Sequence, residues 1–323
     1  MSERVLQSGC PTELATYLQS LLETFEQDPS TARTQLRLLE AAEPGLFCKV
    51  IVPLLAGLRE DSAARQFVSS LLVRSQTLPR ILSDPAAMSL PAARELASSL
   101  SRTEPALDVE LARWLLRGMQ APSDPEAANP TRALRLLEVL NGLTRQHAAS
   151  TLIQLLRHPN NRVRSKAALL VSRCLRSARW VETALSEKDR RVRANAIEGV
   201  WGVEGPGMGK VMRLALGDPD NRVAGNALVG LSQLGDLSAS AFLEEMAAHK
   251  RFEFRATAAW AMGYLADAQF VPVLSKLLKD PAAPVRRSAL RALLRFRKLM
   301  AQQAGLMGAE MQPEQKLDQG AAG

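Results

Sequence analysis

The side chains that could do acid–base or metal chemistry are few in this chain of 323 residues. His147, His158 and His249 are its only histidines, and no spacing of His, Cys and Asp suits a zinc site or a nucleophile with its base. His158 and His249 fall at equivalent turn positions of a repeated pattern, so a structural role explains them better than catalysis does. We therefore predict no catalytic residues, no metal and no cofactor.

Neither the glycine-rich segment nor the cysteines indicate a site. Segment 205–210 (GPGMGK) is superficially similar to a phosphate-binding loop. It lacks the first glycine at the required distance and the Ser or Thr after Lys210, and no strand precedes it, so we expect an ordinary loop between helices. Cys10, Cys48 and Cys174 are too widely spaced for a disulfide framework or a metal knot, which predicts buried thiols in a cytoplasmic protein.

The composition indicates a helical globular protein whose second half is basic. Hydrophobic residues make up 46% and charged residues 23%, but aromatic residues only 4%, which favours packed helices over strands. No stretch approaches the roughly 20 apolar residues of a membrane span. Residues 1–150 carry 15 basic and 17 acidic side chains (net −2), whereas residues 151–323 carry 26 and 16 (net +10). A basic half predicts an acidic protein surface, a nucleic acid or an anionic membrane as partner, with a solvated arginine-rich surface as the alternative.

The elements that would position a site come from an internal repeat. Five copies align on apolar anchors at spacings of 29, 31, 31 and 31 residues, namely Val163, Val192, Val223, Phe254 and Val285. Four residues after each anchor stands an alanine, without exception: Ala167, Ala196, Ala227, Ala258 and Ala289. Further apolar columns lie eight residues after each anchor and seven and eleven residues before it. So many shared columns indicate a true repeat.

Each copy is predicted to form two helices joined by a turn. Apolar residues at steps of three and four, such as Leu152, Leu155 and Leu156, predict the first helix. Proline with Asp or Asn, as in segments 158–161 (HPNN) and 218–221 (DPDN), ends that helix and caps the next one. Because one pair cannot bury its apolar face alone, the copies must stack. We predict an all-α fold, a right-handed α-solenoid of antiparallel helix pairs with a period of about 31 residues.

The anchor region resembles HEAT repeats. Segments 160–164 (NNRVR) and 189–193 (DRRVR), each with an alanine four residues after the valine, are similar to this family, and the period is that of the short type named after phycobilisome lyases. The resemblance covers about residues 130–297. It implies a ladder of Asp and Arg side chains between neighbouring repeats, which Ala224 interrupts in the third copy. In the fourth copy, segment 251–254 (RFEF) replaces the Asp-x-x-Val pattern, and we expect a differently shaped turn there.

Three regions are predicted along the chain. Residues 1–125 are read as divergent helical pairs, residues 126–300 as the HEAT-like array and residues 301–323 as a disordered tail. Segment 121–130 (APSDPEAANP) is the best linker candidate, and residues 132–140 are read as the second helix of a sixth copy. The expected helical runs in the first region are 33–42, 47–58, 63–73, 92–100 and 107–119.

Helical geometry defines the predicted binding face. If the anchor and the residues four, five and eight later are buried, then the residues three, six and ten later point outward, and second helices line the concave surface of such solenoids. The predicted partner-binding residues are Lys166, Leu169, Arg173, Asn195, Glu198, Asn226, Val229, Gln233, Thr257, Trp260, Tyr264, Arg291 and Arg295. Trp260 and Tyr264, one turn apart, are typical interface anchors, with packing against the next repeat or the tail as the alternative.

A basic row marks the last predicted helix. Arg287, Arg291 and Arg295 follow one another at steps of four residues. A row of one sign favours a partner of opposite charge, or else it is the polar outer face of a capping repeat.

The sequence therefore favours a non-catalytic scaffold or adaptor that binds another protein through its concave face. One alternative is non-specific nucleic-acid binding through the basic half. Another is a lyase-like or glycosylase-like activity, which only the family resemblance implies and for which Trp260 with Glu198 or Glu253 is the nearest candidate set.

Overall fold

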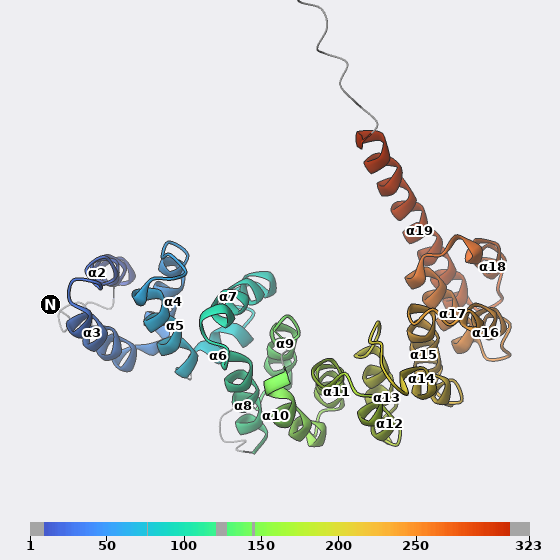
Figure 1. The fold of residues 1–323 in the computed structure, drawn as a ribbon, viewed down its shortest axis with the longest axis horizontal. Coiled ribbons are helices and arrows are strands. Elements are labelled where there is room, and N and C mark those ends of the chain that lie inside the picture. Colours follow the sequence, from blue (N-terminus) through green and yellow to red (C-terminus); the bar gives the residue numbers. More distant parts are fainter. Residues whose placement is uncertain (1–9, 76, 121–127, 144–145, 311–323) are drawn as a thin grey trace, which may run out of the picture. The chain divides into compact units, whose positions relative to one another are not determined.

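The computed structural model describes residues 10–75, 77–120, 128–143 and 146–310, and within these ranges it contains helices and turns but no strand (Figure 1). The chain divides into two compact units, Met1–Leu175 and Arg176–Gly323, which we call the amino-terminal and carboxy-terminal units. The division falls inside the predicted array of residues 126–300, not at its start. The all-α prediction is confirmed.

The amino-terminal unit stacks its helices in two layers. In one layer α2, α4, α6, α9 and α11 contact one another in succession, and in the other α3, α5, α7, α8 and α10 do so. Its helices are α2 (Pro11–Glu23), α3 (Pro29–Ala42), α4 (Pro44–Leu55), α5 (Ala63–Arg74), α6 (Thr77–Ser83), α7 (Leu90–Thr103), α8 (Leu107–Gln120), α9 (Pro130–Leu140), α10 (Ala149–Gln154) and α11 (Asn161–Leu175). The predicted helical runs are confirmed. The short α6, which has a proline at position 79, was not predicted.

The carboxy-terminal unit is a regular array of helix pairs. Its helices are α12 (Ala178–Ala184), α13 (Arg190–Glu198), α14 (Met208–Ala215), α15 (Asn221–Gln233), α16 (Ser238–Ala247), α17 (Phe252–Leu265), α18 (Val271–Leu277) and α19 (Ala283–Glu310). Each even-numbered helix packs on the helix that follows it, and the second helices α13, α15, α17 and α19 contact one another in that order. This arrangement is the stacked helix pairing of an α-solenoid.

The register of the repeat is confirmed by helix positions and by burial. The second helices α11, α13, α15, α17 and α19 begin at residues 161, 190, 221, 252 and 283, at the predicted steps of 29, 31, 31 and 31. The five alanines of the shared column, Ala167, Ala196, Ala227, Ala258 and Ala289, are all 0% exposed. A methyl group is all that fits at this level, because each second helix there meets its own first helix and its neighbours.

One turn geometry recurs before these helices. The carboxylate of Asp218 accepts a hydrogen bond from the amide of Asp220 (2.8 Å), and that of Asp280 accepts one from Ala282 (2.8 Å). In two other copies a histidine takes the same part: Nδ1 of His158 accepts from Asn160 (3.0 Å), and Nδ1 of His249 accepts from Arg251 (3.1 Å). Burial lowers the pKa of His158, which keeps the ring neutral and its nitrogen an acceptor. The predicted structural role of these two histidines is confirmed.

The fourth turn keeps its shape and loses only its cap. The residue before the helix has nearly the same backbone angles at Asp189 (φ −78°, ψ 108°), Asp220 (φ −93°, ψ 123°) and Arg251 (φ −83°, ψ 125°). The side chains of Asp189 and Asp220 cap their helices, whereas Arg251 forms no such bond. The expectation of a differently shaped turn was wrong, because His249 still supplies the acceptor that fixes it.

Arginine–aspartate pairs tie neighbouring repeats together at two junctions. Arg193 of α13 donates through Nε and Nη2 to Asp218 (2.7 and 2.9 Å), and Arg255 of α17 donates in the same way to Asp280 (2.6 and 2.9 Å). In each pair the Nη1 group also donates to two backbone carbonyls of the arginine's own turn. The junction between α15 and α17 has Ala224 and His249 at the corresponding positions. The predicted ladder and its interruption are both present.

Two predictions about irregular segments have different outcomes. The helix α19 continues to Glu310, so residues 301–310 are helical where a disordered tail was expected, and residues 311–323 lie outside the described residues. Residues 121–127 of the predicted linker lie outside them as well, and α9 begins at Pro130. Segment 205–210 contains the end of a loop and the start of α14, with Gly207 at φ 81°, a left-handed conformation that suits glycine.

Candidate functional site

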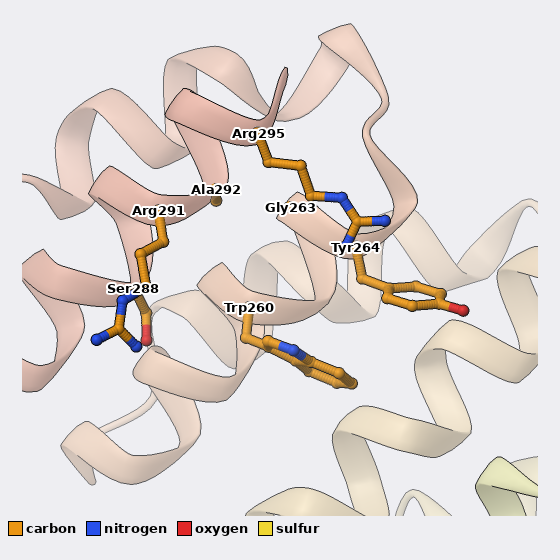
Figure 2. A pocket seen from close by; sticks show the side chains of 7 residues that line it. All are labelled: Trp260, Gly263, Tyr264, Ser288, Arg291, Ala292 and Arg295. Carbon is orange, nitrogen blue, oxygen red and sulfur yellow. The ribbon is translucent and has the colours of Figure 1, made fainter. Parts of the chain in front are cut away.

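A pocket lies between α17 and α19 of the carboxy-terminal unit (Figure 2). Its lining residues are Trp260, Gly263 and Tyr264 of α17, and Ser288, Arg291, Ala292 and Arg295 of α19. Its volume of about 190 Å³ is well below the range of roughly 300–1,000 Å³ that is usual for small-molecule sites. Four of the seven lining residues were predicted as partner-binding residues, and the structure brings these four together.

Two small residues create the hollow. Gly263 faces Ala292 where α17 and α19 approach most closely, and a Cβ atom built on Gly263 would lie 2.7 Å from the Cα atom of Ala292. The two helix backbones can meet there only because both residues are small. The larger side chains of Trp260, Tyr264, Arg291 and Arg295 line the pocket around this contact.

An aromatic cluster supports one wall of the pocket. Trp260 and Tyr264 lie 5.9 Å apart between ring centroids, and Trp201 lies 6.2 Å from Trp260 and 5.0 Å from Tyr264. The Nε1 atom of Trp201 donates to the carbonyl of Asn226 (2.8 Å), which fixes that ring. Trp260 is nevertheless 41% exposed, whereas Tyr264 is half-buried. The rings thus pack on the array and still present Trp260 to solvent, and the role of the pair as interface anchors stays a prediction.

Trp201 was missed by the sequence analysis. It follows the end of α13, two copies before Trp260, and it has no aromatic counterpart at its position in the other copies. The only available signal was the scarcity of tryptophan, with 4 in the whole chain. That signal does not say which tryptophans meet.

Arginine forms the rest of the pocket rim. The guanidinium of Arg295 lies over the Tyr264 ring, 5.1 Å from its centroid. In Figure 2 the Arg295 side chain extends toward Tyr264, and Arg291 lies on the other side of Trp260. Both arginines are exposed, and no ion pair to either is found among the described residues. Arg287, the first member of the predicted basic row, is exposed but does not line the pocket.

The expectation that the third and sixth columns point outward was wrong for Leu169, Asn226, Val229 and Thr257, which are buried. For the three residues of the carboxy-terminal unit, the reason is that a second helix is covered on both flanks by its neighbours, as α15 is by α13 and α17. Asn226 reaches the preceding repeat, where its Nδ2 atom donates to the carbonyl of Ala194 (2.9 Å). Thr257 is held by Asn221, whose Nδ2 atom donates to its hydroxyl (2.5 Å).

The other predicted residues are more accessible. Asn195 and Glu198 are half-buried and Gln233 is exposed, all in the carboxy-terminal unit. In the amino-terminal unit, Lys166 pairs with Glu138 (2.7 Å) and Arg173 donates to the side chain of Asn141 (2.5 Å). These two basic side chains are therefore engaged by their own unit, in contrast to Arg291 and Arg295.

The described residues offer no second chemistry at the pocket. No carboxylate lines it, so the glycosylase-like alternative gains no support, and Glu253 lies instead beside Arg251 (3.7 Å). No group of three His, Cys, Asp or Glu residues in the described ranges could hold a metal ion. Cys48 and Cys174 are buried, as predicted, whereas Cys10 is only half-buried because it lies at the start of α2. Burial raises the pKa of Cys48 to about 12 and that of Cys174 to about 11. Across the described ranges, the helices are all too short or too polar to cross a bilayer.

Comparison with solved structures finds remote likenesses. An engineered protein is 15% identical over 92% of this chain and 94% of its own, with a TM-score of 0.33. Human deoxyhypusine hydroxylase, in a structure with glycerol, is 17% identical over 79% of this chain and 99% of its own, with a TM-score of 0.31. A designed armadillo repeat protein is 17% identical over 76% and 99%, with a TM-score of 0.28.

The sequence comparisons are more specific. No curated protein matches the chain. One family does match, over the segment that runs from the end of α16 into α19, and its description is HEAT repeats. The segment that matches HEAT repeats, residues 248–304, contains the whole pocket.

Proposed function

We propose that the protein is a non-catalytic scaffold or adaptor that binds another protein through the second helices of its carboxy-terminal unit, with the pocket of α17 and α19 at the centre of the contact. The observation that carries this proposal is Trp260, a large aromatic side chain that is 41% exposed beside two arginines for which the described part of the chain offers no ion pair. Tryptophan and arginine are the residues most enriched among those that dominate binding energy at protein interfaces.

The size and lining of the pocket support a protein partner. A space of about 190 Å³ is small for a metabolite or a cofactor, but it suits one side chain inserted from a partner surface. The lining has no carboxylate, histidine or cysteine that could act as base or nucleophile. Asn195, Glu198 and Gln233 would extend the contact along the same layer of helices.

Affinity capture with matched variants tests the proposal. We expect Trp260→Ala to lose a partner protein that the wild-type chain captures from its native lysate. Phe242→Ala is the control, because Phe242 on α16 is exposed to the same degree (42%) but does not line the pocket. If both variants retain the same captured proteins as the wild type, the pocket is not the partner site.

Non-specific nucleic-acid binding is a second candidate, supported by the charge of α19. Residues 283–309 contain six basic side chains and no acidic one: Arg286, Arg287, Arg291, Arg295, Arg297 and Lys298. Phosphate contacts would make such binding steeply dependent on salt. The variant Arg287→Glu/Arg291→Glu/Arg295→Glu should then abolish binding to a duplex oligonucleotide at low salt, and unchanged binding would remove this candidate.

A further inference from the structure

We propose that the ligand of the α17–α19 pocket is an acidic peptide segment of the partner, in which one apolar side chain enters the pocket and a neighbouring Asp or Glu side chain binds Arg291 and Arg295. This inference rests on the proposed function and specifies the chemistry of the partner.

The charge of the pocket rim gives the first argument. Arg291 and Arg295 are one helical turn apart on α19 and flank the exposed face of Trp260 (Figure 2). No carboxylate among the described residues forms an ion pair with either arginine, so the two cations repel each other. A carboxylate of a bound ligand would offset that repulsion. A partner segment of opposite charge is therefore favoured over a neutral or basic one.

The orientation of Arg295 gives the second argument. Its guanidinium carbon lies 5.1 Å from the centroid of the Tyr264 ring, in a cation–π contact. This contact holds the group in place and leaves the N–H edges that point away from the ring able to donate. Because the group is already oriented, less conformational entropy is lost when those edges bind a planar carboxylate with two parallel hydrogen bonds.

The apolar part of the ligand follows from the floor of the pocket. Gly263 and Ala292 form a floor without polar side-chain atoms, and Trp260 and Tyr264 form an aromatic wall. An aliphatic or aromatic side chain of the partner would lose water on all sides there, whereas a polar one would find only Ser288 as a neutral hydrogen-bonding side chain. The pocket thus selects an apolar residue next to the acidic one.

The same features disfavour a nucleic acid as ligand of this pocket. Among the predicted partner-binding residues of the carboxy-terminal unit that are accessible, Arg291 and Arg295 are positive and Glu198 is negative. A phosphate backbone that followed these residues would therefore meet cations on α19 and a carboxylate on α13. The Trp260 ring is also tilted by 33° and 34° against Trp201 and Tyr264, so its neighbours already occupy part of the surface on which a base would stack.

The test is a selection from a displayed random-peptide library on the immobilised full-length chain, followed by affinity measurements with the selected peptides. We expect the peptides that depend on Trp260 to pair an apolar residue with Asp or Glu within one helical turn. Replacement of that Asp or Glu by Asn or Gln should weaken binding by about tenfold, and blocking the peptide's carboxy-terminus as an amide should leave it unchanged.

Charge reversal on the protein gives the matched control. The variant Arg291→Glu/Arg295→Glu should bind the acidic peptides at least about tenfold more weakly and should bind lysine versions of them more tightly than the wild type does. The variant Arg287→Glu/Arg297→Glu carries the same change of charge on the same helix, outside the pocket, and should change either affinity by less than about threefold.

The contrary outcomes separate this inference from the proposed function. Suppose that the selected peptides lose affinity for Trp260→Ala but bind Arg291→Glu/Arg295→Glu as tightly as the wild type. The proposal of an acidic ligand would then be wrong, whereas the proposal of a protein-binding pocket would still hold. Peptides that are indifferent to Trp260→Ala would overturn both. Tight binding of single-stranded oligothymidylate that both charge reversals weaken equally would overturn the peptide ligand in favour of a nucleic acid.

Discussion

The junction between α15 and α17 differs from its two neighbours in the way it holds adjacent repeats together. On either side, the Arg193–Asp218 and Arg255–Asp280 pairs connect the repeats through two charge-assisted hydrogen bonds each. Between α15 and α17, position 224 is an alanine and the acceptor of the turn is His249. The arginine and the aspartate are thus missing together, so neither junction partner is left as an isolated charge.

The middle junction is held by contacts other than an Arg–Asp pair, and one of them is a hydrogen bond from Nη1 of Arg251 to the carbonyl of Pro219 (3.4 Å). Asn221 donates to the carbonyl of Glu253 (3.3 Å) and to the hydroxyl of Thr257, and Gly225 lets the helices approach at Thr257. The His249 ring lies against Phe254, with 4.3 Å between centroids, and Arg251 covers the other side of Phe254 at 5.1 Å. The shape of the turn and the connection between repeats are therefore separate functions of this position. The turn needs only a hydrogen-bond acceptor there, whereas the ion pair to the preceding repeat also needs a carboxylate.

The largest expected effect concerns the close helix approaches at the two junctions of α17. Gly263→Ala should lower the free energy of unfolding by about 3 kcal/mol, because its Cβ atom would collide with the backbone of Ala292. Gly225→Ala should cost less, about 1–2 kcal/mol, because the obstacle is the Thr257 side-chain methyl group. Denaturant unfolding measures both changes.

A second substitution sharpens that comparison. Thr257→Ser removes the obstructing methyl group and keeps the hydroxyl that Asn221 binds. It should therefore restore most of the stability lost in Gly225→Ala and do nothing for Gly263→Ala. The expectation would be contradicted if Gly225→Ala and Gly263→Ala lost the same free energy of unfolding and Thr257→Ser restored stability to neither. The two junctions would then not differ in the kind of obstacle that a Cβ atom meets.

Loss of one charged partner should produce the next largest effect. Asp218→Asn keeps an oxygen for the amide of Asp220 but loses the charge that Arg193 binds, and it should cost about 2 kcal/mol. His249→Asn, the equivalent change at the middle junction, keeps the acceptor for Arg251 and should cost about 0.5 kcal/mol through the lost ring contact. A cost at His249 as large as that at Asp218 would contradict the division of tasks.

Acid should weaken the two charged junctions in preference to the middle one. For Asp218, burial acts to raise the pKa, but the hydrogen bonds from Arg193 and from the backbone outweigh it and leave the pKa below the ordinary value of 3.8. The Arg255 hydrogen bond is the main cause of the lowered pKa of Asp280. Because the folded pKa values lie below the unfolded ones, this stabilisation is complete above about pH 4 and is lost as the pH falls through the folded values.

The measurement is thermal unfolding as a function of pH. The wild type should lose part of the roughly 2 kcal/mol per Arg–Asp pair as the pH falls below 4. The variant Asp218→Asn/Asp280→Asn has already lost these pairs, so its stability should fall less steeply over the same pH range. His249→Asn should leave that decline as in the wild type. An acid decline that is equally steep in the double variant would assign it to other carboxylates.

The smallest expected effect comes from building the missing pair. Ala224→Arg/His249→Asp should reproduce the Arg–Asp tie between α15 and α17 and add up to about 1 kcal/mol, while each single change should destabilise because it places one unmatched charge at the junction. A double-mutant cycle isolates the coupling between the two positions. No favourable coupling would mean that the packing around Phe254 excludes the pair.

The sequence was sufficient for the fold and for the register of the repeat. The five alanines and the anchor spacings predicted where each second helix begins and which side of it is buried, because the pattern reports the same packing five times. The interruption of the Asp–Arg ladder at Ala224 could also be predicted, because the resemblance to HEAT repeats implies an arginine at that position. The two histidines in the turn column could be assigned for the same reason.

Only part of the candidate site could be predicted from the sequence. Trp260, Tyr264, Arg291 and Arg295 were predicted and lie together, but Asn226, Val229 and Thr257 were expected on the surface and are buried. The spacing of apolar residues indicates which face of a helix packs against its paired helix. It does not indicate which other faces are buried by the neighbouring repeats. The contribution of Trp201 depends on contacts across two copies, which no spacing within one copy encodes.

The turn column reads His158, Glu187, Asp218, His249 and Asp280 along the array. Where the column holds histidine or aspartate, the turn closes on a side-chain acceptor, and only the aspartates also tie the repeat to an arginine of the preceding one. One column of the sequence therefore supplies the acceptor of these turns and, where it holds aspartate, also the carboxylate of an ion pair to the preceding repeat. Among the junctions described in the carboxy-terminal unit, the one that lacks this ion pair leads directly into the helix that carries Trp260.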